Sequence, residues 1–461
     1  MKTHEIKYNV KFPYEIESTI QTIVENGGDV YLVGGVVRDI AMNNFNFKDY
    51  DFEVFNMQPE TLAQLLNCEL SGNTFAVFNV FLNEMEVQFS IPRTEIKSGT
   101  GYNGFDVKFD PFMTIEQAAR RRDFTFNAMY INVNVNDRNV IIDPFDGLTD
   151  LQLGKIRPID YNVFKEDPVR ILRAIQFSGR FGFEIANYDT FRYYVMYLSK
   201  ELEKEPSERV IIEINKLLNK SISAIGISYL YDLSMLPMFK FIAEMAWTEQ
   251  CEIYHMEGDV FVHTVNVMQS LIQLRNDEFD IELATMYAAL FHDYGKVYTS
   301  KLKGIIDGKK RITAIGHELK SAELFDNWCD EFAPQFDRVM RNRIKLLISS
   351  HMVDVPEIKR LSVIHGKDFA MQLCLLILAD QIGRRPIGEK KAGEMEQLYK
   401  WFQTNTIERL VTGKTLIKYG YKPSEQFGDW LNILLKAQIR GTLKESNIEQ
   451  MIKTVCGRSF N

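Results

Sequence analysis

The sequence predicts an α+β protein in which a small N-terminal sheet domain is followed by a mostly α-helical remainder. Two patterns carry this prediction. Between residues 28 and 143, short runs of β-branched and aromatic residues alternate with Gly and Asn breaks, as in strands. After residue 150, apolar residues recur with the period of about 3.6 that is typical of helices, and strand signals nearly vanish. With 461 residues, 46% of them apolar, the chain is long enough for several packed domains.

Short segments with the strand pattern follow one another in the first third of the chain. They are DVYLVGG (29–35), DYDFEVF (49–55), FAVFNVFL (75–82), MEVQFSI (85–91), AMYINVNV (128–135) and NVIID (139–143). The clearest helical segments come later, DPVRILRAIQFSGRFGF (167–183) and ERVIIEINKLLNKSI (208–222). We therefore expect one sheet domain, with helices making up almost all of the rest.

Charge and composition exclude several classes of protein. The formal net charge of -8 argues against indiscriminate nucleic-acid binding, although a local basic surface can still hold one RNA end. Neither a signal peptide nor a run of about 18 apolar residues is visible, so we expect a cytoplasmic protein without membrane contact. The five cysteines form no CxxC pair, which favours reduced, mostly buried thiols. The oligomeric state stays open.

The first candidate site begins where a predicted strand ends. Gly34 and Gly35 follow this strand, and Arg38 lies in the first turn of the expected helix. Paired glycines let a phosphate approach the backbone, although the same pair also forms ordinary tight turns. Farther along, Asp49 and Asp51 are two residues apart on a strand, so both project from one face and can bind the same Mg²⁺ ions. Alone, such a pair is often only two solvated acids.

Five motifs in this order resemble those of class II tRNA nucleotidyltransferases, the CCA-adding enzymes and their bacterial poly(A) polymerase relatives. The motifs are LVGGVVRD (32–39), KDYD (48–51), RRDFTFNAM (121–129), EDPVRILRAIQFSGRFGF (166–183) and ERVIIE (208–213). The resemblance runs over essentially the whole chain, including a branch of the family that carries an HD domain. It implies that the protein adds C, C and A to the 3′ end of tRNA from CTP and ATP, without a nucleic-acid template.

The resemblance also implies roles for individual residues. Two Mg²⁺ ions held by the catalytic Asp49 and Asp51 would activate the primer hydroxyl and neutralise the α-phosphate. Gly34, Gly35 and Arg38 would cradle the triphosphate. Four further residues correspond to family positions near the triphosphate and ribose: Arg121, Arg122, Asp123 and Asn127.

Asp167 and Arg170 predict how the nucleotide is chosen. Cytosine and adenine both present a ring acceptor beside an exocyclic amine donor, whereas uracil and guanine present the reverse. An Arg donor beside an Asp acceptor complements the first pair and opposes the second. By resemblance these two residues are the amino-acid template, and we expect Arg173 to extend the site. The alternative is a local salt bridge worth a few tenths of a kcal/mol.

Two segments near the predicted metal site complete the comparison with the family. Where the family usually has a third carboxylate, this chain has Gln88, and we hypothesise that Glu86 on the same face partly replaces it. The Gly-rich stretch from Arg93 to Pro111 resembles the flexible loop with which these enzymes change from C to A, although such a loop can also be passive.

A second constellation consists of histidines and aspartates in the helical part. His263, His292 with Asp293, and Asp380 resemble the H…HD…D signature of the HD phosphohydrolase superfamily. His317 and His351 lie where members with two metals have further ligands. The resemblance implies a divalent metal, Mg²⁺, Mn²⁺, Ni²⁺ or similar, that activates water against a phosphoester. For His255, a role at this site and an ordinary position in the hydrophobic core are equal alternatives.

The resemblance implies four domains. They are a nucleotidyltransferase catalytic (palm) domain at 1–145, a helical nucleotide-recognition neck at 146–235, an HD phosphohydrolase domain at 236–390, and a helical tail at 391–461 that contacts tRNA. Two other functions stay open, a poly(A) polymerase of the same family and an HD phosphohydrolase whose nucleotidyltransferase site is inactive.

Overall fold

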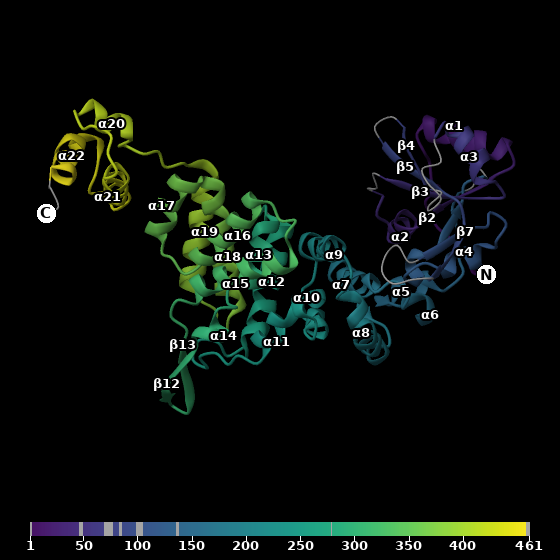
Figure 1. Cartoon of the computed structure of the whole chain (residues 1–461), viewed down its shortest axis with the longest axis horizontal. Coiled ribbons are helices and arrows are strands. Elements are labelled where there is room, and N and C mark those ends of the chain that lie inside the picture. The colour runs from purple at the N-terminus through teal and green to yellow at the C-terminus, as the bar shows by residue number, and fades with distance from the viewer. Residues whose placement is uncertain are drawn as a thin grey trace. The chain divides into compact units, whose positions relative to one another are not determined.

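The structure is a computed structural model that describes residues 2–45, 49–68, 77–82, 85–97, 105–134, 138–277 and 279–457. The chain divides into two compact units, Met1–Pro237 and Met238–Asn461. Figure 1 shows that the large sheet belongs to the first unit and that the second unit is almost wholly helical. The predicted α+β fold is therefore confirmed, while the finer division into four domains stays a prediction.

The first unit is built on a seven-stranded sheet with the order β1-β9-β8-β2-β3-β5-β4. All neighbouring strands are antiparallel except β3 and β5, which are parallel. Every predicted strand is present; β1 was not predicted, and it pairs with β9. The bounds are β1 (Lys2–Glu5), β2 (Asp29–Val33), β3 (Tyr50–Phe55), β4 (Val77–Leu82), β5 (Met85–Ser90), β8 (Tyr130–Asn132) and β9 (Val140–Asp143).

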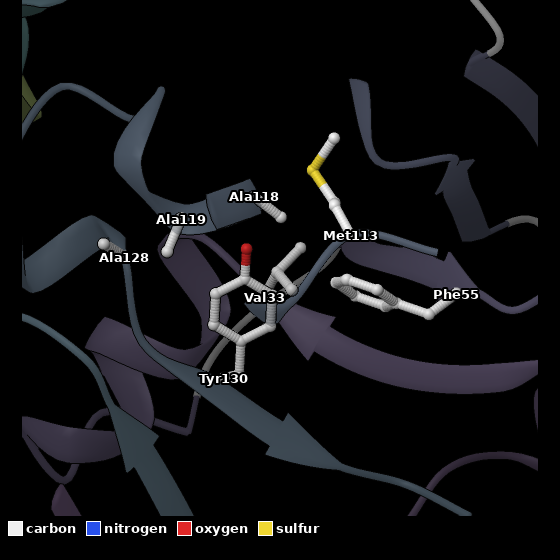
Figure 2. Packing of buried hydrophobic residues seen from close by; sticks show 7 residues of the cluster. All are labelled: Val33, Phe55, Met113, Ala118, Ala119, Ala128 and Tyr130. Atoms are coloured by element: carbon white, nitrogen blue, oxygen red, sulfur yellow. The ribbon is translucent and has the colours of Figure 1, made fainter. Parts of the chain in front are cut away.

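A buried cluster fixes the central strands against helix α4 (Ile115–Arg120). Figure 2 shows the ring of Tyr130 on β8 beside Val33 at the end of β2, with Phe55 of β3 close by. Ala118 of α4 completes the packing, because its small side chain lets the helix approach the sheet. This packing holds the ends of β2 and β3 in fixed positions beside the segment that follows α4.

Helices make up most of the rest of the first unit, beside the strand pairs β6–β7 (Arg93–Lys97 and Phe105–Phe109) and β10–β11 (Lys155–Ile156 and Glu184–Ile185). The helices are α1 (Tyr14–Glu25), α2 (Gly35–Ala41), α3 (Pro59–Leu65), α5 (Gly147–Gln152), α6 (Tyr161–Phe164), α7 (Val169–Phe181), α8 (Tyr188–Leu202), α9 (Ser207–Lys220) and α10 (Ile225–Tyr229). Helices α7 and α10 approach closely because Gly226 has no side chain: a Cβ there would lie 2.6 Å from the carbonyl oxygen of Ile175. Helix α9 also packs on α7.

The second unit is a helical bundle. Its helices are α11 (Lys240–Ala246), α12 (Val260–Asp277), α13 (Leu283–Phe291), α14 (Lys296–Thr299), α15 (His317–Phe332), α16 (Arg338–Ser350), α17 (Val355–His365), α18 (Lys367–Gly383), α19 (Glu389–Thr404), α20 (Gly413–Lys418), α21 (Phe427–Ile439) and α22 (Ile448–Cys456). Helix α18 is apolar and buried on nearly every side, as expected of a central helix. Among the described residues, no helix is both long and apolar enough to cross a membrane.

The structure corrects the sequence prediction in two places. The predicted helical region contains the hairpin of β12 (Lys301–Ile306) and β13 (Lys309–Thr313), joined by Asp307 and Gly308. Both turn residues have positive φ, as in a two-residue hairpin turn. The Asp-Gly pair was therefore a hairpin signal, which the sequence analysis did not use. The other correction concerns the predicted loop: its flanks form the paired strands β6 (Arg93–Lys97) and β7 (Phe105–Phe109), and residues 98–104 lie outside the described part.

Candidate functional site

One cavity of about 820 Å³ in the first unit brings together every predicted nucleotide-site residue. These residues are Gly34, Gly35, Arg38, Asp49, Asp51, Arg121, Arg122, Asp123, Asn127, Asp167, Arg170 and Arg173. Further lining residues that the sequence did not single out include Gln176, Phe177, Arg180, Arg209, Glu213, Lys216 and Lys220. Nine lining side chains are Lys or Arg and five are Asp or Glu, so the cavity is locally basic in an acidic chain.

Gly34 occupies a conformation that requires glycine. Its φ of 72° with ψ of -137° is a region that other residues rarely adopt. A Cβ at this position would lie 3.4 Å from both Arg122 Nη1 and Asp51 Oδ2, so it would occupy the space beside these two side chains. The turn between β2 and α2 therefore leaves room beside Asp51 for another group.

Asp51 lies on β3 opposite Gln88 of the parallel strand β5. Gln88 donates from Nε2 to Asn79 Oδ1 at 2.9 Å, so its amide is held by β4. Burial raises the pKa of Asp51; Asp49 and Glu86 act in the same direction, and Arg122 opposes them. Carboxylates that disfavour one another's charge are stabilised together by a cation, so the donor set fits Mg²⁺.

Glu53 is a residue of this site that the sequence analysis missed. It follows Asp51 by two positions on β3 and is fully buried. Arg121 Nη2 donates to Glu53 Oε1 at 2.7 Å, and the Tyr130 hydroxyl donates to Oε2 at 2.7 Å. Arg122 Nη2 lies 3.6 Å from the same carboxylate. The buried acid thus holds both arginines of the predicted triphosphate site, and the alternation of acids along β3 was its only sequence signal.

A chain of polar contacts joins α2 to α7. Arg38, only 4% exposed, donates from Nη1 to Asn127 Oδ1 at 2.9 Å, and its other nitrogens donate to Asp39. Asn127 Nδ2 donates to Asp123 Oδ1 at 2.9 Å, and Arg173 Nε donates to Asp123 Oδ2 at 2.7 Å. Burial alone would raise the pKa of Asp123, but Arg173 and the Asn127 amide hold it below its ordinary value.

Asp167 and Arg170 do not pair with each other. Helix α7 begins at Val169, after Asp167, whose carboxylate accepts from Arg209 Nη2 of α9 at 3.1 and 3.2 Å. Arg170 donates to two backbone carbonyls, Val163 O at 2.9 Å and Arg121 O at 2.8 Å. The local salt bridge considered as the alternative is therefore not formed. Arg209 belongs to the fifth motif, where it had not been singled out.

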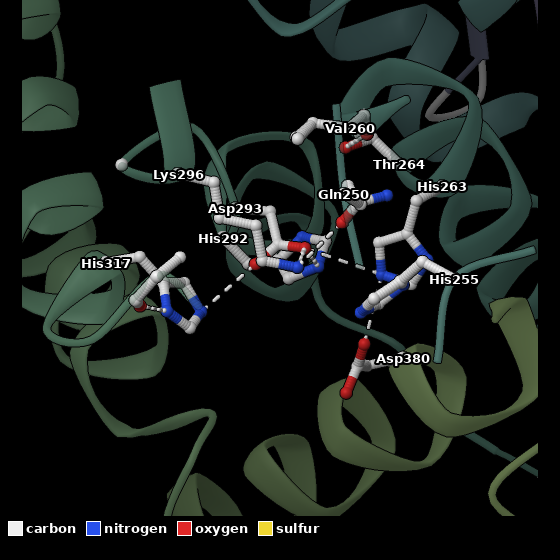
Figure 3. Close-up of polar contacts among 12 residues, drawn as sticks. Gln250, His255, Val260, His263, Thr264, His292, Asp293, Lys296, His317 and Asp380 are labelled. Carbon is white, nitrogen blue, oxygen red and sulfur yellow. Dashed lines mark hydrogen bonds and ion pairs between the residues drawn. The ribbon is translucent and has the colours of Figure 1, made fainter. Parts of the chain in front are cut away.

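The second unit has a pocket of about 530 Å³ at its own buried histidines. The six predicted ligands form two buried groups whose candidate ligand atoms lie within 4.8 Å of one another: His263, His292 and Asp380 in one, Asp293, His317 and His351 in the other. His263 Nε2 lies 3.1 Å from Asp380 Oδ1, and His317 Nε2 lies 3.1 Å from Asp293 Oδ1. Figure 3 shows Asp293 between His317 and His263, whose Nε2 atoms lie 3.1 and 3.5 Å from its carboxylate.

The histidine rings are all oriented by contacts at Nδ1. His292, His317 and His351 have Nδ1 within 2.8 Å of the backbone carbonyls of Ala289, Ala314 and Ile348. A proton on Nδ1 leaves the Nε2 lone pair pointing toward the neighbouring ligands. The Nε2 atoms of His317 and His351 are only 3.2 Å apart, so two neutral rings would oppose their lone pairs.

A cation bound between these nitrogen atoms would remove the repulsion between their lone pairs. His292 Nε2 is buried and has no hydrogen-bond partner within the described residues. Burial, together with His292 and His317, lowers the pKa of His351 to about 3, so this imidazole is neutral and able to bind a metal. Imidazoles and carboxylates are the donor set of divalent transition metals, so the residues present fit the predicted metal centre.

His255 is not a simple core residue. It lines the same pocket, and its Nδ1 lies 2.8 Å from Glu257 Oε1. The same oxygen lies 2.9 Å from His263 Nδ1, and Glu257 Oε2 accepts from the backbone N–H of Arg385 at 2.6 Å. Glu257, which the sequence analysis did not name, thus orients two histidines at once.

Comparison with known proteins finds a matching family model, similar sequences and similar folds. Residues 30–157 match the family model of the poly A polymerase head domain. The chain is 35% identical over 276 residues to the multifunctional CCA protein of Haemophilus influenzae and 33% identical over 276 residues to that of Pasteurella multocida. Each match covers 59% of this chain and 64% of the relative, which is less than two thirds of the relative's length.

Solved structures share the fold over nearly the whole chain. The Bacillus stearothermophilus CCA-adding enzyme in complex with CTP has a TM-score of 0.64 at 19% identity, covering 97% of this chain and 98% of that one. The Thermotoga maritima CCA-adding enzyme complexed with tRNA has a TM-score of 0.61 at 20% identity, covering 99% of both chains. The head-domain match, the similarity to curated CCA proteins and the shared fold agree with the resemblance carried by the five motifs.

Proposed function

We propose that the cavity of the first unit adds C, C and A to the 3′ end of tRNA, using CTP and ATP. One observation carries the proposal: the paired carboxylates Asp49 and Asp51 line the same cavity as the base-selecting candidates Asp167 and Arg170. The relatives named as CCA proteins and the neighbours solved with CTP and with tRNA support this choice of substrates.

In this proposal Asp49 and Asp51 hold Mg²⁺. The bound metal supplies a lowered pKa for the primer hydroxyl and charge neutralisation at the α-phosphate. Arg121 and Arg122, held by Glu53, bind the triphosphate with guanidinium groups whose positions are already fixed. Arg38 has a positioning role, because its guanidinium is buried against Asp39 and Asn127.

Asp167, Arg170 and Arg209 choose the base. Asp167 keeps acceptor capacity after binding Arg209, because a carboxylate offers about four lone-pair sites. Its carboxylate accepts a hydrogen bond from the exocyclic amine of C or A, while an N–H group of Arg170 or Arg209 donates to the ring nitrogen. A base with the reversed pattern leaves buried polar groups unpaired, which costs about 1–3 kcal/mol for each group.

The test is an addition assay with purified protein, Mg²⁺ and tRNA transcripts that end at the discriminator base, at C or at CC. We expect two C residues and one A, with UTP and GTP refused. Unlimited addition of A to any RNA would instead indicate a poly(A) polymerase. If a folded protein adds no nucleotide, the proposed activity of the first cavity is wrong. Gln88→Asp would then test whether the missing carboxylate is the cause.

The histidine pocket of the second unit supports a second activity. We propose a metal-dependent phosphohydrolase in which water attacks phosphorus and the P–O3′ bond breaks. It would release phosphate from a 3′-phosphate, or open a 2′,3′-cyclic phosphate to a 2′-phosphate, and either reaction frees the 3′-hydroxyl that the first cavity extends. The observation that carries it is the pair of buried ligand groups, in one of which His292 Nε2 has no hydrogen-bond partner among the described residues. RNA ending in a 2′,3′-cyclic phosphate, incubated with Mg²⁺, Mn²⁺ or Ni²⁺, should be opened only when a metal is bound. Hydrolysis that persists in the metal-free protein would contradict the proposal.

A further inference from the structure

We propose that Arg384 and Lys391 form a phosphate-binding subsite beside the histidine cluster, which holds the phosphoryl group of the substrate. The inference rests on the proposed phosphohydrolase and names its substrate-binding residues. Arg384 follows the end of α18, and Lys391 lies in the first turn of α19. Both line the 530 Å³ pocket together with Asp293, His317 and Asp380.

The two cations are close enough to repel each other. Burial lowers the pKa of the Lys391 ammonium, Arg384 acts in the same direction, and Asp380 opposes them. Like charges that are partly removed from water are costly unless an anion lies between or beside them. Their position therefore calls for an anion in the pocket.

Among the described residues, Asp380, Glu394 and Asp354 act on the Lys391 ammonium only from beyond ion-pair distance. Over the described ranges, neither Arg384 nor Lys391 has a carboxylate oxygen within ion-pair distance, and Arg384 Nε is buried without a hydrogen-bond partner. The other basic residue of the pocket differs: Lys296 is bound to Asp293 Oδ2 at 2.6 Å and to Gln250 Oε1 at 2.8 Å, contacts that Figure 3 shows. Two cations thus stay available, beside a cluster suited to metal ions.

The rest of the pocket favours a phosphate that carries an organic body. Tyr254, Ile315 and Met352 line it and are 59%, 85% and 52% exposed, so their apolar surfaces face the pocket opening and solvent. A base or ribose can cover such groups, whereas inorganic phosphate cannot. The phosphoryl group is the shared chemistry, and a nucleotide should bind more tightly than free phosphate.

The adjacent residues Arg385 and Lys390 provide matched controls. Both side chains are exposed and neither lines the pocket, yet each carries the same charge as its neighbour in the subsite. Replacing each of the four residues by Gln removes one charge at a time. The metal content of every variant, measured by mass spectrometry, shows whether the histidine cluster is intact.

The experiment is calorimetric titration of the metal-loaded, full-length protein with inorganic phosphate and with the slowly hydrolysed adenosine 3′-phosphorothioate. We expect Arg384→Gln and Lys391→Gln to weaken both ligands about tenfold, and the controls to stay within about twofold, since each lost contact is a charge-assisted hydrogen bond. Nucleotide addition and its KM for tRNA should not change in the subsite variants.

The possible results separate this inference from the hydrolase proposal. Equal weakening in all four variants would indicate a general positive field and overturn the subsite, as would no weakening in either subsite variant. A raised KM for tRNA in those variants would assign the cations to RNA binding and also overturn it. Charge-dependent binding without hydrolysis of any phosphoester would keep the subsite and remove the hydrolase.

Discussion

The two pockets of this protein differ in the kinds of polar groups that they bring together. In the first unit Arg38, Arg121 and Arg170 all donate to acids, amides or backbone carbonyls at fixed positions. In the second unit His292 Nε2 has no hydrogen-bond partner among the described residues, with Asp293 Oδ2 3.3 Å away, and the Nε2 atoms of His317 and His351 are 3.2 Å apart. We propose that protein contacts prepare the first site and that a cation would complete the second.

This difference predicts which binding property each pocket loses when a residue is changed. Fixed arginines cost no reorganisation when an anionic ligand arrives, so their supporting acids matter as much as they do. Metal ligands act together, so the removal of one of them empties the site. The two units should also respond independently, because each pocket is formed within its own unit.

Asp51→Asn should have the largest effect. Loss of a metal-binding charge removes several kcal/mol of transition-state stabilisation, which corresponds to a fall in nucleotide addition of about 10³-fold or more. Opening of a cyclic phosphate by the second unit should stay within about twofold of the parent, a bound set by the usual independence of distant sites. Both rates are measured on the same preparation, and joint loss would contradict two separate centres.

His292→Ala should give the mirror result. We expect metal bound by the second unit to fall below detection and hydrolysis to fall by about 10³-fold, because an incomplete ligand set binds weakly. Addition of CTP and ATP should continue. His365, which is exposed and lies outside both ligand groups, provides the control His365→Ala, whose metal content should equal that of the parent.

Asp123→Asn should destabilise the first unit by about 2 kcal/mol at pH 7, because the hydrogen-bonded ion pair with Arg173 is lost and Arg173 keeps only Glu213 at 4.0 Å. The pKa of Asp123 is lowered by folding, so its contribution is fully present above about pH 4 and is lost as the pH falls through the lowered value. The deficit of the variant should therefore shrink below about pH 4.

Urea unfolding of the first unit can be followed by hydrogen exchange of its peptides. Tryptophan fluorescence is unsuitable, because all four Trp residues lie after residue 237. A deficit that stays constant from pH 7 to about pH 3 would show that the ionised carboxylate of Asp123 is not what stabilises the fold.

Arg209→Gln should lower the discrimination of CTP and ATP against UTP and GTP by about tenfold, because Asp167 loses the contact that holds its carboxylate. The total rate of addition should fall less than the discrimination. Arg192→Gln is a suitable control, since Arg192 pairs with Asp232 and does not line the cavity. Equal loss of all four nucleotides would assign Arg209 to structure alone.

Glu86→Gln should have the smallest effect, a reduction of several-fold in addition and a higher Mg²⁺ requirement, because Glu86 acts on Asp51 by charge from an exposed position. Gln88→Asp is the informative counterpart: it places an acid directly opposite Asp51 and should lower the Mg²⁺ requirement. A Glu86→Gln protein with unchanged Mg²⁺ dependence would remove Glu86 from the site.

Much of this molecule could be predicted from local patterns. The strand periodicity that places Asp51 on the cavity face, the Gly34 turn and the order of the histidines are set by near neighbours in the chain, so the sequence shows them directly. The hairpin at Asp307 and Gly308 was also written in the sequence and was overlooked. The β1 strand was not, because Lys2–Glu5 forms a strand only by pairing with β9.

The sequence by itself thus determined the fold class, both sets of candidate residues and the departure at Gln88. Only the tertiary structure decided which side chains are in contact. Arg209 donates to Asp167, 42 residues away in the sequence, and Arg121 donates to Glu53, 68 residues away. Arg384 and Lys391 meet Asp293 in one pocket for the same reason. Such contacts depend on how helices and strands pack, and the packing of distant segments leaves no periodic trace in the sequence.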